Sequence, residues 1–244
     1  MDIWQIKAVE KMTAFITDLY NVKEIELCGS MLNKSLLDIF SDVDMNIFLQ
    51  GDSDFDKNEF ICKLTGKFKV FGYEIHVLDN MHVFRICLEN GWRFDLSFYH
   101  SKPIHTEDRI PADTFFKDKI DSIINSFWFH SFMILVKLGR GDYLVASHLT
   151  LELCQIDIVI QMLVRDNQSG TNIHRFGEKE DIPILDSLFR LDNTGNFSHE
   201  NTATKIKHVL FLAAEHMDNT SESLNLGYSP QSNKLKALQH KFNV

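Results

Sequence analysis

The chain combines 244 residues with a hydrophobic content of 44%, 20 phenylalanines and a formal net charge of −9. This composition excludes a disordered chain and suffices for one large domain or two small ones. The acidic balance argues against a protein that binds long nucleic acid, which would need a basic surface.

No pattern in the sequence predicts a zinc site, a secretion signal or a membrane span. The four cysteines include no C-x-x-C pair, which favours free thiols in a reducing cytoplasm, and the 11 histidines are scattered without H-x-x-x-H spacing. Residues 1–5 lack the basic start and apolar run of a signal peptide. The longest apolar stretch, 123–138, is interrupted by polar residues, unlike the ~18 continuous apolar residues of a membrane helix. We therefore expect a cytoplasmic protein with no membrane partner.

The first hundred residues alternate between helical and strand patterns. Residues 2–20 place apolar side chains, including Ile6, Met12 and Ile16, on one helical stripe. Asn90-Gly91 predicts a hairpin, because this pair accepts the positive φ of a tight turn. We expect a short helix within 30–40, a second helix at 55–67 capped by an aspartate or serine of 51–54, and strands at 24–28, 42–50, 69–78, 83–88 and 93–98.

After Pro103 and Pro111 the character of the chain changes. From about Asp113 onward only helical periodicity is present. The sequence thus predicts an α+β protein, with a small mixed β-sheet and flanking helices in a first domain, 1–105, and a bundle of helices in a second domain, 106–244. The expected helices span 113–140, 142–166, 181–191, 199–219 and 231–241.

Three aspartates on predicted strands form the main candidate site. Asp42 and Asp44 lie two residues apart, so their side chains point to the same face of one strand. Asp95 lies on the polar face of a later alternating strand. If the two strands pair, three carboxylates converge, which is unfavourable unless a divalent cation lies between them. Hard oxygen ligands of this kind suit Mg²⁺, and two such ions would form a clamp for nucleotidyl transfer.

With Gly29-Ser30 at the end of the preceding strand, these residues resemble the motif of the DNA polymerase beta-like nucleotidyltransferases. The resemblance covers residues 22 to about 99, and it implies that the Gly-Ser turn holds a triphosphate while Asp42, Asp44 and Asp95 hold two Mg²⁺ ions. The length and the segment 126–162 look most like the bacterial antibiotic nucleotidyltransferases of the streptomycin and lincosamide groups. That narrower resemblance implies antibiotic resistance through transfer of AMP from ATP, or of another nucleoside monophosphate from its triphosphate, to an antibiotic hydroxyl.

Three cations are candidates for binding the triphosphate. Lys34 follows the Gly-Ser turn, and it is either a point charge for the phosphates or a solvated lysine. Lys137 and Arg140 end the first long helix of the second domain. The resemblance implies a phosphate-binding lysine in this helix, whereas the alternative is that both cations only complement the helix dipole.

The transfer also requires a carboxylate that takes the proton of the acceptor hydroxyl. In the related enzymes this group comes from the helical domain, which makes Asp121 the first candidate and Glu152 the second. Asp121 could instead cap its helix. Phe127 and Trp128 could line the acceptor pocket or belong to the core.

The expected partners are a nucleoside triphosphate and a small hydroxylated antibiotic, an aminoglycoside or a lincosamide, and the resemblance also makes a homodimer plausible. Two alternatives stay open at this point. The enzyme could act on a protein or RNA acceptor, as in toxin–antitoxin pairs, or the fold could be a non-catalytic nucleotide-binding module. The presence of all three acids favours activity over the last of these.

Overall fold

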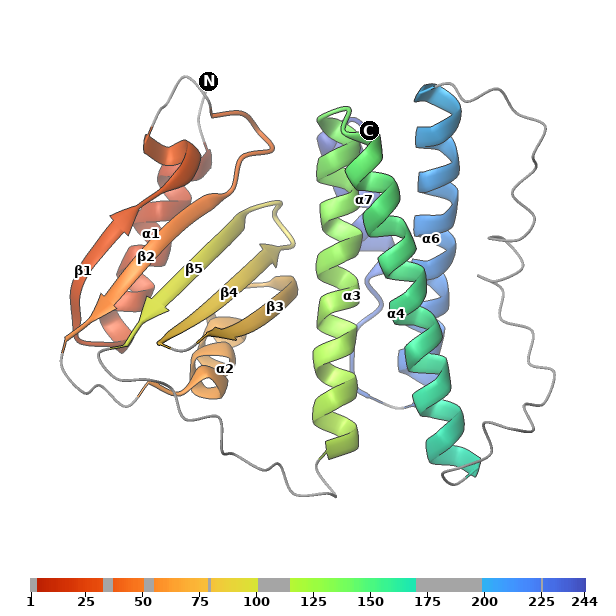
Figure 1. Cartoon of the computed structure of the whole chain (residues 1–244), viewed down its shortest axis with the longest axis horizontal. Coiled ribbons are helices and arrows are strands. Elements are labelled where there is room, and N and C mark those ends of the chain that lie inside the picture. Colours follow the sequence, from red (N-terminus) through yellow and green to blue (C-terminus); the bar gives the residue numbers. More distant parts are fainter. Residues whose placement is uncertain are drawn as a thin grey trace. The chain divides into compact units, whose positions relative to one another are not determined.

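The computed structural model describes residues 4–32, 37–50, 55–78, 80–100, 115–169, 199–224 and 226–244 (Figure 1). The chain divides into two compact units, 1–116 and 117–244, and each is described by itself. The predicted domain boundary, between residues 105 and 106, falls in the segment 101–114, outside the described residues. The predicted helix at 181–191 also lies outside them.

The first unit contains a five-stranded sheet in the order β1-β2-β5-β4-β3 (Figure 1). Its one parallel pair is β2 with β5, and the other neighbouring strands are antiparallel. The sheet is therefore mixed, as the sequence predicted. The strands are β1 (Val22–Leu27), β2 (Val43–Leu49), β3 (Val70–Leu78), β4 (Met81–Leu88) and β5 (Arg93–Tyr99).

One face of this sheet builds the core of the unit. Residues of β2 alternate between buried and half-buried, with Val43, Met45, Ile47 and Leu49 buried. Their face packs against the buried sides of α1 (Trp4–Leu19) and α2 (Lys57–Lys67). The polar residues of the alternation occupy the opposite face, and the candidate aspartates lie there.

The predicted elements are present, with local differences at the first two helices. Ile6, expected on the buried stripe of α1, is 43% exposed, whereas Gln5 is buried because its amide donates to the carbonyl oxygens of Asp38 and Ser41. The N-cap of α2 is Asp56, which accepts from the backbone of Asn58 and Glu59, so the cap predicted within 51–54 was wrong. The helix expected within 30–40 is a short 3₁₀ helix, Gly29–Leu32.

The described elements of the second unit are all helices. Phe127 and Trp128 are buried in its core, which favours the core over the pocket as their role. Asp121 lies well inside the first helix, so it is not the helix cap. These helices are α3 (Phe115–Gly139), α4 (Tyr143–Ser169), α6 (His199–Ser223) and α7 (Ser232–Phe242). The structure confirms the predicted α+β class.

One stretch of α4, Tyr143–Val164, is long and apolar enough to cross a membrane by length and composition. This stretch differs from 123–138, the longest apolar-rich stretch considered in the sequence, which lies in α3. A single helix of this kind is weak support for a span, because core helices of soluble proteins pass the same test. Asp157, in the middle of the stretch, is fully buried and accepts a hydrogen bond from His216 of α6. A buried, paired acid of this kind is consistent with a helix packed inside a bundle.

Candidate metal and nucleotide site

The open face of the sheet brings three aspartates together. Asp44 lies on β2, Asp42 directly precedes that strand, and Asp95 lies on β5. The parallel pairing of β2 with β5 sets Asp44 opposite Asp95. One carboxylate oxygen from each aspartate lies within 4.8 Å of the others. The convergence expected from the sequence is therefore present in the fold.

The three carboxylates repel one another, and a bound cation would relieve this repulsion. Partial burial, followed by the negative charges of Asp42 and Asp95, raises the pKa of Asp44 to about 6. Burial also raises the pKa of Asp95, against the opposing effect of the Arg85 guanidinium. A divalent ion between the carboxylates would reverse both shifts, because it favours the ionised form.

A glycine holds the adjoining turn against the aspartates. Gly29 has a φ of +56°, a conformation that L side chains rarely adopt. A Cβ at this position would also overlap the Oδ2 atom of Asp44. The turn is tied to β2 by a hydrogen bond of 3.0 Å from the Cys28 backbone N–H to the Asp44 carbonyl oxygen. Glycine is thus required here both by the backbone and by the close approach of the carboxylate.

The Ser30 hydroxyl lies next to this glycine and is shielded from solvent. Its Oγ atom has no hydrogen-bond partner within the described part of the chain. A buried hydroxyl without a partner is unfavourable by about 1–3 kcal/mol, so it points to a ligand that supplies one. A phosphate oxygen beside a divalent ion would fit this donor.

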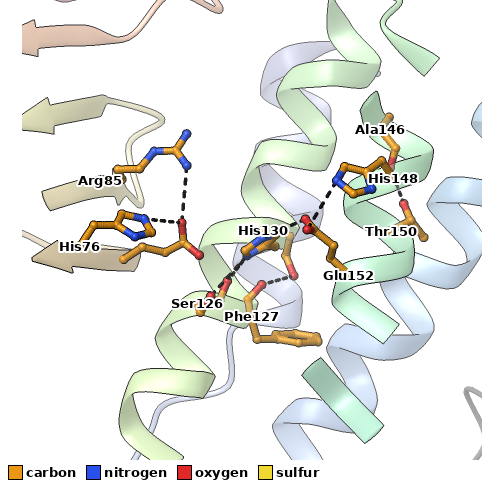
Figure 2. Close-up of polar contacts among 11 residues, drawn as sticks. His76, Arg85, Ser126, Phe127, His130, Ala146, His148, Thr150 and Glu152 are labelled. Carbon is orange, nitrogen blue, oxygen red and sulfur yellow. Dashed lines mark hydrogen bonds and ion pairs between the residues drawn. The ribbon is translucent and has the colours of Figure 1, made fainter. Parts of the chain in front are cut away.

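A row of ionisable side chains, which was not predicted from the sequence, continues from Asp95 across the sheet. Arg85 of β4 faces Asp95 in the register, and its Nε atom lies 3.4 Å from Asp95 Oδ2. The NH1 atom of Arg85 lies 3.5 Å from Glu74 of β3, which in turn lies 3.8 Å from His76 (Figure 2). The predicted hairpin contained the signal, since residues equally far from Asn90 face each other across it.

The remaining candidate residues are placed elsewhere. Lys34 lies outside the described residues. The other four belong to the second unit, which is described by itself. Lys137 lies in the last turn of α3 and Arg140 directly after it, Asp121 accepts a hydrogen bond of 3.0 Å from the Tyr228 hydroxyl, and Glu152 lies between two histidines of α3 and α4.

The donor set fits the metal that the sequence implies. Three carboxylates on a rigid sheet offer hard oxygen ligands to Mg²⁺ while leaving positions for phosphate oxygens. Within the described residues, these aspartates are the one group of three acids, histidines or cysteines whose ligand atoms all lie so close together. The arrangement can bind a divalent cation beside a phosphate-sized ligand at the Gly-Ser turn.

Comparisons with known proteins add little to this picture. No protein-family model matches the chain, and no curated protein matches it. A search of solved structures finds the crystal structure of an aminoglycoside 6-adenyltransferase from Bacillus subtilis, at 14% identity and a TM-score of 0.40, covering 99% of this chain and 97% of that one.

Proposed function

We propose that the chain is a Mg²⁺-dependent nucleotidyltransferase. It moves a nucleoside monophosphate, AMP from ATP, to a hydroxyl of a small antibiotic, an aminoglycoside or a lincosamide. The observation that carries the proposal is the convergence of Asp42, Asp44 and Asp95 beside a Gly-Ser turn with an unpartnered buried hydroxyl. The acceptor class comes from the sequence resemblance, and the alternatives are a protein or RNA acceptor and a module without turnover.

The aspartates would hold the metal ions, whose chemistry is to neutralise charge on the phosphate oxygens and to lower the pKa of the acceptor hydroxyl. The Ser30 hydroxyl and the N–H groups of its turn donate to the triphosphate. A bond forms between the acceptor oxygen and the α-phosphorus, the bond to the β-phosphate oxygen breaks, and pyrophosphate leaves. Positioning and charge neutralisation carry most of the catalysis in such a transfer.

The second unit would supply the proton acceptor and two cations. Asp121 and Glu152 are both candidates for the base, and both already have polar partners in the structure. Lys137 and Arg140 would contact the triphosphate. We further propose a cytoplasmic enzyme that acts on small molecules, not on long nucleic acid or a membrane, and that assembles as a homodimer.

The test is pyrophosphate release from ATP and Mg²⁺ across a panel of aminoglycosides and lincosamides. We expect release that depends on one acceptor class and disappears in Asp44→Asn. Asp18→Asn, an exposed acid on α1, serves as the matched control and should retain activity. If ATP binds but no antibiotic in the panel causes pyrophosphate release, the proposed acceptor class is wrong and a protein or RNA acceptor is favoured. Failure to bind ATP and Mg²⁺ would overturn the proposal itself.

A further inference from the structure

A buried carbonyl group lies directly before the first of the three aspartates. The Ser41 carbonyl oxygen accepts a hydrogen bond of 3.1 Å from Gln5 Nε2 and another of 3.1 Å from Arg93 Nη2. These three residues are at most 2% exposed. A carbonyl oxygen has two lone pairs, so the two side chains can use both of them. We refer to Gln5 and Arg93 together as the Ser41 clamp.

The two donors of the clamp are themselves held in place. Gln5 Nε2 also donates to the Asp38 carbonyl oxygen at 2.7 Å, so one amide group bridges both ends of the turn 38–41. The guanidinium carbon of Arg93 lies 5.7 Å from the ring centroid of Trp4. Contact with an aromatic ring restricts a guanidinium group and hence the direction of its N–H groups. The clamp therefore ties the turn to α1 on one side and to β5 on the other.

The position of Asp42 depends on this carbonyl because Asp42 precedes the sheet. β2 begins at Val43, and its register with β5 begins at the same residue. Asp44 and Asp95 are thus placed by the paired strands, whereas Asp42 is not. The Ser41 carbonyl and the Asp42 N–H belong to one rigid peptide plane. Two buried hydrogen bonds to that carbonyl therefore fix the plane from which the Asp42 side chain extends.

We propose that Gln5 and Arg93 are positioning residues of the metal site, which act on Asp42 through the Ser41 carbonyl. The inference rests on the proposed function, because it takes the aspartates as metal ligands. Before an ion binds, the three carboxylates repel one another, and without the clamp Asp42 would turn away from the other two. Hydrogen bonds that orient metal ligands are a general feature of such sites, and their loss weakens metal binding by about 10–100-fold.

The test is calorimetric titration of the full chain with Mn²⁺, which needs no acceptor. Gln5→Leu and Arg93→Met remove each donor while retaining a side chain of similar length. Each should weaken Mn²⁺ binding about tenfold, and Arg93→Lys, which keeps a charged donor, should weaken it less. The control is Ile16→Val, in the core on the opposite face of the sheet, which should lower stability but leave the Mn²⁺ affinity unchanged. If Arg93→Met does not fold, Gln5→Leu decides.

A double-mutant cycle with Asp42→Asn separates positioning from a general loss of stability. If Gln5 acts through Asp42, Gln5→Leu should weaken Mn²⁺ binding in the unaltered chain but change it little in the Asp42→Asn background. Equal losses in both backgrounds would overturn the proposal, as would a Gln5→Leu variant that binds Mn²⁺ as tightly as the unaltered chain. An unaltered chain that does not bind Mn²⁺ would instead overturn the proposed function, and this inference with it.

Discussion

Asp44 in the sheet unit and Asp157 in the helical unit are both at least half-buried, but they have different neighbours. Asp157 lies against a histidine, whereas Asp44 lies beside two other carboxylates. Asp157 is fully buried, and its carboxylate contacts His216 Nδ1 at 2.8 and 3.0 Å. Asp44 is only half-buried, and its pKa is raised first by that burial and then by the like charges of Asp42 and Asp95. The more deeply buried acid is therefore the balanced one. The candidate site is thus distinguished by carboxylates that repel one another and not by the depth of their burial.

The comparison is tested most strongly by Asp44→Asn. Transfer should fall on the order of a thousandfold or more, because the metal ions supply several kcal/mol of charge stabilisation. The metal-free protein should nevertheless become more stable, by about 1–2 kcal/mol, since a repelled carboxylate is removed. Paired measurements of transfer rate and urea unfolding would check this. A less stable metal-free variant would contradict the electrostatic account of the site.

Removal of the balanced acid should have the opposite effect on stability. Asp157→Ala leaves His216 without its partner and opens a buried gap, so the free energy of unfolding should fall by about 3–5 kcal/mol. Asp157→Asn should cost less, because the amide oxygen still accepts from the neutral imidazole. Urea denaturation of the two variants, side by side, provides the measurement. Equal stability of Asp157→Ala and the unaltered chain would show that this pair is not structural.

Gly29→Ala tests whether the turn beside the aspartates is more sensitive to an added methyl group than an ordinary turn is. The substitution strains the backbone and also forces a methyl group into the Asp44 carboxylate, so we expect a loss of about 2–4 kcal/mol and weaker Mn²⁺ binding. Gly141→Ala is the matched control, because Gly141 has a φ of +72° but open space around a Cβ. It should lose only about 1 kcal/mol and bind Mn²⁺ normally. Calorimetric titration with Mn²⁺ measures the affinity of both variants. Equal affinities would contradict the role of Gly29 in the site.

The smallest effect is a pH dependence of opposite sign in the two units. Burial, and then the charge of His100, lowers the pKa of His82 from 6.5 to about 4. The unfolded chain binds the extra proton, so this residue makes stability fall as pH drops from 6.5 toward 4, by about 1–3 kcal/mol. The hydrogen bond that His216 Nδ1–H donates to the Asp157 carboxylate raises the pKa of His216 above 6.5. The contribution of His216 to stability is complete below pH 6.5 and is lost as the pH rises through the pKa of His216 in the folded chain.

Unfolding free energies at about pH 5, 7 and 8 would separate these terms. His82→Phe should flatten the acid side of the profile, and His216→Gln the alkaline side. An exposed histidine variant, His208→Ala, should leave both sides unchanged. If His82→Phe still lost as much stability at low pH as the unaltered chain, buried His82, whose ring nitrogen lies 2.9 Å from that of His100, would not be the source of that loss.

The sequence was sufficient to predict the sheet unit because its signals are local. Alternation revealed β2 and β5, and Asn90-Gly91 fixed the hairpin that sets Arg85 opposite Asp95. The pairing of β2 with β5 could only be assumed, since it joins strands far apart in the chain. The resemblance to a family motif supplied that step and the roles of the three aspartates.

The helical unit was less predictable because packing between helices leaves no short-range pattern. The convergence of His130 and His148 on Glu152, and of His216 on Asp157, depends on which faces of two helices meet. The sequence therefore indicated only scattered histidines and did not reveal these contacts. Similarly, Gln5 was missed as a buried residue because its partners are carbonyl groups 33 and 36 positions later.

The position of β5 in the middle of the sheet has a consequence for how the protein reaches its folded state. The residues of the β4–β5 hairpin are neighbours in the chain, but Asp95 meets Asp44 only when β5 pairs with β2, which lies before α2 and β3 in the chain. Contacts of such large sequence separation form slowly, because the loop must close before they contribute. We therefore expect the cluster of three aspartates to be completed at a late step of folding, so that a divalent ion would bind only chains whose sheet is already assembled.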